Sequence, residues 1–180
     1  METDRIAPVN STPRTSIEVE VGDNQSHLAV PPGFLEGVAR RTLGGQGIDR
    51  ASVSIALVDD PTIREINRRH LGHDWPTDVI TFPLSDPGDP ELSGELVVSA
   101  EMAVATAGES GADPLHELAL YVVHGLLHLC GLDDQTPEDA DAMRAGEGEA
   151  LASLGLTNTF PLVGPPDSAV EGMEMKRWPR

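Results

Sequence analysis

The segment from Asp113 to Gly131 constrains the fold most, because it predicts a helix that is apolar around nearly its whole circumference. Asp113-Pro114 is typical of an N-cap followed by the first helical residue, and Gly131 suits the left-handed position after the last turn. A helix this apolar is largely buried, so we expect it to be the central helix of the domain. Its apolar residues are Leu115, Leu118, Leu120, Val122, Val123, Leu126, Leu127 and Leu129.

The other elements predict an α+β fold, a small four-stranded sheet with about five helices packed around it. Strands are expected at 17–21, 53–58, 79–82 and 96–98, with a loop over 84–93. Helices are expected from Pro31-Pro32 through Arg41, from the N-cap Asp60 through Ile66, and at about 100–109, 114–130 and 137–154. We expect one domain over 15–156, a disordered N-terminal lead over 1–14 and an extended C-terminal tail over 157–180.

The charge and composition of the chain argue against several classes of function. The chain has 180 residues, a net charge of −18 and 3% aromatic residues, which argues against a broad basic face for nucleic acid and against DNA as a partner. Five of the twelve basic residues are Arg40, Arg41, Arg64, Arg68 and Arg69, so a local basic strip remains possible. No apolar stretch predicts a membrane span or an export signal, and the single cysteine fits a reducing cytoplasm.

Two histidines on the central helix predict a divalent-metal site. His124 and His128 are four residues apart, so their imidazoles project from one face about one turn apart. Because Gly131 reverses the chain, Asp133 or Asp134 can return towards them as a third ligand, leaving an open fourth position as in catalytic zinc sites. The competing interpretation is a pair of hydrogen-bonded core histidines without a metal.

Gly125 distinguishes this site from that of a helical zinc protease. Such proteases carry a glutamate general base immediately after the first histidine, and glycine has no side chain that can accept a proton. Peptide hydrolysis by that mechanism is therefore disfavoured.

Three blocks of the sequence are similar to known motifs. Residues 124–134 are His-Gly-Leu-Leu-His-Leu-Cys-Gly-Leu-Asp-Asp, similar to H-G-x-L-H-L-x-G-Y-D-H, and Met143 follows nine residues later. Asn67 is followed by residues 74–83, Asp-Trp-Pro-Thr-Asp-Val-Ile-Thr-Phe-Pro, which are similar to D-x-P-T-D-V-L-S-F-P. Residues 94–98, Gly-Glu-Leu-Val-Val, are similar to a G-D-[IL]-x-[IL] strand. In this order and spacing the three blocks resemble the YbeY family of bacterial rRNA maturation factors and single-strand-specific endoribonucleases.

The resemblance implies a mixed sheet and one zinc ion held by His124, His128 and the residue in place of the third histidine, Asp134. Aspartate can bind zinc, but its negative charge makes the bound ion less electron-poor. It also makes the site better suited to harder metals. The family's arginine for RNA handling is replaced by Leu71. Arg68 and Arg69, on the preceding helix end, are therefore the candidate phosphate-binding catalytic residues, and ordinary solvated arginines are the alternative.

The resemblance thus implies a cytoplasmic zinc-dependent endoribonuclease acting on single-stranded RNA in 16S rRNA processing and in ribosome maturation and quality control. Its partners would be ribosomal RNA and the small ribosomal subunit or associated proteins. Because of the charge of −18, we expect weak intrinsic RNA affinity, with a partner bringing the substrate. Two alternatives remain open: a peptidase-like metallohydrolase, and a ribosome-assembly module with a structural metal.

Overall fold

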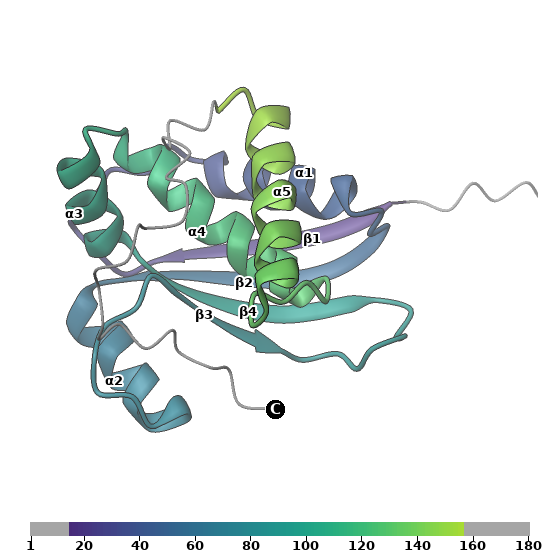
Figure 1. Cartoon of the computed structure of the whole chain (residues 1–180), viewed down its shortest axis with the longest axis horizontal. Coiled ribbons are helices and arrows are strands. Elements are labelled where there is room, and N and C mark those ends of the chain that lie inside the picture. Colours follow the sequence, from purple (N-terminus) through teal and green to yellow (C-terminus); the bar gives the residue numbers. More distant parts are fainter. Residues whose placement is uncertain (1–14, 157–180) are drawn as a thin grey trace, which may run out of the picture.

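A four-stranded mixed sheet covered by helices on both faces forms the domain in the computed structural model, which describes residues 15–156 (Figure 1). The predicted N-terminal lead and C-terminal tail lie outside the described residues. The elements in chain order are β1 (Ser16–Asp23), α1 (Phe34–Gly45), β2 (Arg50–Val58), α2 (Asp60–Leu71), β3 (Val79–Pro83), β4 (Leu92–Ser99), α3 (Ala100–Ser110), α4 (Pro114–Leu129) and α5 (Pro137–Ser153). The predicted fold class is confirmed. None of the helices in this range has the length and apolar character needed to cross a membrane.

The sheet has the strand order β1-β2-β4-β3, so β3 is an edge strand that follows a helical crossover. β1 pairs parallel with β2, β2 pairs parallel with β4, and β3 pairs antiparallel with β4. In β4, Leu96 and Val98 belong to the main core, whereas Val97 belongs to a second cluster with Ile63 of α2. Because successive side chains of a strand alternate between faces, α2 covers the face of the sheet opposite to α4. Figure 1 shows the same division, with α2 alone below the sheet.

The start of two helices differs from the prediction. α2 is capped by Asp59, whose side chain accepts from the Thr62 N–H, and not by Asp60. The Asp60 carboxylate instead accepts from the Ser99 hydroxyl at 2.6 Å, so it ties α2 to the end of β4. α1 begins at Phe34 and not at Pro31-Pro32, because Gly33 precedes it in the left-handed conformation (φ 77°). β4 also begins earlier than predicted, at Leu92.

Two glycines allow α4 to approach the sheet closely. A Cβ at Gly125 of α4 would lie 2.4 Å from Leu96 Cδ2, and a Cβ at Gly94 of β4 would lie 2.5 Å from Leu129 Cδ2. Real Cβ atoms essentially never make such contacts, so a side chain at either position would force Leu96 or Leu129 to move. α4 therefore lies against β3 and β4, and His124 and His128 lie on either side of the Gly125 contact, rotated from it by about 100° and about 60° around the helix.

Glu117 is a buried carboxyl group on α4, only 5% exposed. Burial raises its pKa, the Tyr121 hydroxyl hydrogen bond opposes the rise, and the negative charge of Asp78 adds to it. A raised carboxyl pKa means that the folded protein binds this proton more tightly than the unfolded chain does.

Glu117→Gln is therefore expected to stabilise the domain at pH 8 more than at pH 4. In the wild type, this group's contribution is fully present below the ordinary value of 4.5 and is lost as the pH rises through the raised folded pKa. The neutral glutamine removes that loss. Urea unfolding of both proteins at several pH values measures the difference. A difference that is constant with pH would show that Glu117 does not titrate abnormally.

Candidate metal centre

The two histidines of α4 face each other through their Nε2 atoms, which are 3.0 Å apart. The other nitrogen of each ring already has a partner. His124 Nδ1 lies 2.7 Å from Glu147 Oε1, and His128 Nδ1 lies 3.0 Å from the Leu132 carbonyl oxygen. Both partners are acceptors, so each Nδ1 donates its proton, and when the rings are neutral two Nε2 lone pairs are directed to the same place. That arrangement suits a cation between them.

Asp134 completes the cluster, and its Oδ2 lies 4.0 Å from His124 Nε2. One ligand atom each of His124, His128 and Asp134 lie within 4.8 Å of one another, and no other such group of three His, Cys, Asp or Glu residues occurs in residues 15–156. Gly131 (φ 95°) ends α4 and turns the chain back, as predicted. The Asp133 carboxylate instead accepts from the Asp134 N–H at 2.8 Å.

These three residues fit a divalent ion. Nitrogen ligands 2.0–2.1 Å from a tetrahedral ion are about 3.3 Å apart, close to the observed Nε2 separation. The donor set of two imidazoles and a carboxylate also suits zinc. The side chains of His124 and Asp134 are both partly exposed, which leaves the cluster accessible from one side. The cluster can therefore hold a metal ion.

Glu147 of α5 is a site residue that sequence reasoning missed. It lies 23 residues from His124 along the chain, and its side chain is 16% exposed. Burial lowers the pKa of His124, but the hydrogen bond and charge of Glu147, with the charges of Asp78 and Asp134, outweigh it and raise the pKa overall. The only sequence signal is that Glu147 follows the buried Met143 by one helical turn. A carboxylate on the distal nitrogen of a metal-ligating histidine fixes its tautomer and ring orientation.

Glu147→Gln is expected to weaken metal binding by roughly 10- to 100-fold, the usual cost of losing such an orienting partner. Glu149→Gln is the matched control, because Glu149 lies on the same helix and is exposed. Competition with a chelator of known affinity measures both variants. Equal affinities in the two variants would contradict an orienting role for Glu147.

An open groove of about 1000 Å³ borders the cluster at His128. Its walls are the chain around Arg50, the β3–β4 loop and the end of α4. Among the residues that line it, Arg50 is the only arginine or lysine, and this arginine is paired with Glu91 at 3.1 Å. The acidic lining residues are Asp49, Asp86, Asp89 and Glu91. The groove is therefore acidic, which disfavours phosphate groups.

Arg68 and Arg69 lie on α2, on the face of the sheet opposite to α4, so the fold does not bring them into the metal cluster. Both are exposed and both bind Glu65. Leu71, at the position of the family's arginine, packs against the small core beneath α2. Exposed ion pairs such as these contribute little to stability, so a phosphate group can replace the carboxylate partner.

Cys130 is not part of the cluster. It is half-buried against the main core, and burial raises the pKa of its thiol to about 11. Met143 is 2% exposed and belongs to the same core. Both residues are therefore apolar packing groups.

A four-stranded mixed sheet, with a His-His-Asp cluster formed by its central helix and the turn after it, defines a candidate metalloenzyme. Residues 32–155 match the protein family described as Endoribonuclease YbeY. The chain therefore belongs to this family, which confirms the resemblance drawn from the three sequence blocks. The family assignment also supports the predicted enzyme class, a hydrolase that cleaves RNA.

Several proteins named Endoribonuclease YbeY are similar to the chain. The Rhodopirellula baltica protein is 48% identical over 129 residues, covering 70% of this chain and 64% of that relative. The Pelotomaculum thermopropionicum protein is 39% identical over 149 residues, covering 77% of this chain and 98% of that relative. The solution structure of a Thermotoga maritima protein matches with a TM-score of 0.54 and 26% identity, covering 77% of this chain and 91% of that one.

Proposed function

We propose that this chain is a zinc-dependent endoribonuclease for single-stranded RNA that acts in 16S rRNA maturation and ribosome quality control in the cytoplasm. The observation that carries the proposal is the cluster of His124, His128 and Asp134 in a chain of this family. Ribosomal RNA is the substrate in this proposal, and the small ribosomal subunit or its proteins are the partners.

His124, His128 and Asp134 would hold the ion, and Asp134 rather than Asp133 would be the third ligand. When bound, zinc would supply Lewis-acid stabilisation of charge on a phosphate oxygen and activation of water. The Glu147 carboxylate and the Leu132 carbonyl keep protons on the two Nδ1 atoms and so present both Nε2 atoms. Arg68 or Arg69 would contact the RNA phosphates from α2.

Each alternative function makes a different demand on the site. A peptidase of the helical zinc class needs a base where Gly125 packs against Leu96 and Thr81, and no side chain fits there. A structural metal needs a closed set of four protein ligands, whereas the cluster offers three ligand atoms and the Asp134 side chain is 39% exposed. Both observations favour a catalytic site that acts on a substrate other than peptide.

The test compares metal-depleted and zinc-reloaded protein on one RNA sequence, supplied single-stranded and as a duplex, beside a panel of peptides. We expect zinc-dependent cleavage of the single strand, much slower cleavage of the duplex and no peptide hydrolysis. Peptide hydrolysis without RNA cleavage would favour the peptidase, and stoichiometric zinc without either activity would favour the structural module.

Arg68→Gln combined with Arg69→Gln is expected to weaken single-stranded RNA binding and to flatten its salt dependence. Each lost phosphate contact should reduce the slope of log affinity against log salt by about 0.7. Arg144→Gln is the control, because Arg144 is also an exposed arginine paired within its own helix, with Asp141. Binding titrations at several salt concentrations measure the slope, and equal slopes for all three proteins would contradict the assignment. Given the net charge of −18, wild-type affinity at physiological salt should remain weaker than nanomolar.

A further inference from the structure

We propose that the stacked rings of His73 and Trp75 form a platform for a nucleobase of the single-stranded substrate; this inference rests on the proposed function. The ring centroids are 4.7 Å apart and the planes are inclined by only 11°. Trp75 is 40% exposed, and Leu84 is the only other large hydrophobic residue exposed in the described part of the chain. Exposed aromatic faces are the usual means by which proteins hold unpaired bases.

The backbone beneath the platform is held in place. Gly72 (φ 74°) ends α2, and the Asn67 side chain, which is 2% exposed, donates to the Trp75 carbonyl oxygen at 2.8 Å. The Asn67 carbonyl oxygen accepts from the His73 N–H. The end of α2 and the platform are thus joined through one buried side chain and its backbone, which reduces the entropy that base binding would have to overcome.

Arginines lie beside the platform. Arg64 Nε donates to Asp74 Oδ1 at 2.9 Å, and Asp74 is the residue between the two stacked rings in sequence. The negative charge of Asp74 also helps to raise the pKa of Arg68, which places Arg68 near the same loop. Both ion pairs are about half exposed, so phosphate oxygens can compete for these guanidinium groups. The surface therefore combines an aromatic face with cations.

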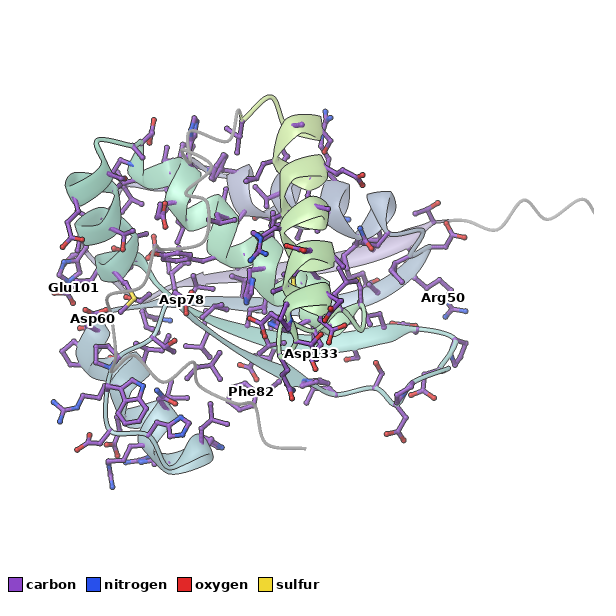
Figure 2. All side chains as sticks on the ribbon, viewed as in Figure 1. Arg50, Asp60, Asp78, Phe82, Glu101 and Asp133 are labelled. Carbon is purple, nitrogen blue, oxygen red and sulfur yellow. The ribbon has the colours of Figure 1, made fainter. Side chains whose placement is uncertain are left out.

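Asp78 links the platform to the metal cluster. Only Pro76 and Thr77 separate Trp75 from Asp78, a span of about 10 Å at most. The Asp78 carboxylate braces the start of β3 by accepting from the Val79 N–H, and its charge acts on His124. Because β3 is an edge strand, RNA can pass around this edge between the platform and the cluster. Figure 2 labels Asp78, just before β3, and Phe82, near the end of β3, and so shows where this strand runs.

The groove beside His128 is the competing location for the RNA strand. Its charged lining is mostly acidic, with one arginine, Arg50, against four carboxylates, those of Asp49, Asp86, Asp89 and Glu91. It also has no tryptophan, tyrosine or phenylalanine among its lining residues. The α2 side therefore offers the better combination of stacking surface and positive charge.

The experiment uses the full, zinc-loaded chain and a short single-stranded oligoribonucleotide, with Trp178→Phe as the background so that Trp75 is the only tryptophan. Quenching of Trp75 fluorescence is recorded within seconds of mixing, at low salt. We expect saturable quenching, as stacking on the indole ring requires. Binding without any change in Trp75 fluorescence would overturn the proposal.

Variants measured by anisotropy of a labelled oligonucleotide extend the test. Trp75→Ala should bind about 5- to 150-fold more weakly, the range for loss of one stacked base, and Trp75→Phe should recover most of the affinity. Leu84→Ala, which removes the other exposed hydrophobic side chain, should bind like the wild type. Thermal unfolding checks that each variant folds. If Trp75→Ala does not fold, the comparison of Trp75→Phe with the wild type still tests the proposal.

The outcomes separate this inference from the proposed function. If the wild type cleaves single-stranded RNA while Trp75→Ala binds and cleaves it equally well, the platform is wrong and the function stands. If RNA binds and quenches the Trp75 fluorescence but is never cleaved, the platform is supported and the proposed nuclease function is wrong.

Discussion

Replacing His124 or Asp134 by alanine is expected to reduce the zinc content of the purified protein from about one ion per chain towards zero. Each residue provides one of the three ligand atoms that lie within 4.8 Å of one another. Loss of a direct ligand should cost more than the roughly 10- to 100-fold that loss of an orienting partner costs. Elemental analysis and chelator competition measure both quantities, and zinc-dependent RNA cleavage should fall in parallel.

Asp133→Ala is the matched control, because Asp133 is the adjacent carboxylate and is bound to the Asp134 backbone N–H. It should retain zinc. If Asp134→Ala keeps its zinc while Asp133→Ala loses it, the third ligand has been assigned to the wrong aspartate.

Asp134→His tests what the aspartate does to the ion. It restores the three-histidine set that the YbeY signature carries and replaces an anionic ligand by a neutral one. The ion becomes more electron-poor, so water at the site should ionise more readily and the pH profile of RNA cleavage should shift to lower pH. A profile that does not move would argue against Asp134 as a ligand.

Gly125→Ala is expected to destabilise the domain by about 1–3 kcal/mol, the usual cost of adding a methyl group to a close-packed core. The new Cβ would lie 2.4 Å from Leu96 Cδ2, 3.0 Å from Thr81 Oγ1 and 3.1 Å from Val79 Cγ2. All three neighbours are buried in β3 and β4, so none can move into solvent. α4 must then shift from the sheet, and because α4 carries both histidines, metal affinity should also fall.

Gly108→Ala provides the control for helix propensity. Gly108 lies in α3 and is exposed, and a methyl group added there would meet nothing within 4 Å. Alanine at this position should stabilise the domain by up to about 1 kcal/mol. Urea unfolding of both variants distinguishes crowding from propensity, and a Gly125→Ala protein as stable as Gly108→Ala would contradict close packing at Gly125.

The sequence predicted most elements because their signals are local. The two ends of α4 lie where Asp113-Pro114 and Gly131 predicted them, because N-caps and left-handed glycines act within one turn. The start of α2 was misassigned by one residue because Asp59 and Asp60 are both capable of capping. Only the position of Ser99 at the end of β4 shows that Asp60 has another partner.

The clustering of the candidate ligands was predicted because they are close in sequence. His124 and His128 share one end of α4 and Asp134 lies in the turn that follows, so helical periodicity and the reversal at Gly131 bring them together. Glu147 was missed because its contact with His124 depends on how α5 packs against α4. That packing is set by side chains such as Met143 and by the small size of Gly146 opposite Leu127.

The apolar helix with its two histidines was therefore determined by sequence alone, because spacing along one helix fixes relative direction. The tertiary structure decided the rest. It decided that Gly125 faces the sheet, that Glu147 contacts His124, and that α2 with its arginines covers the opposite face. The physical reason is that these relations depend on packing between elements distant in the chain, and no local propensity encodes which face of a sheet a helix covers.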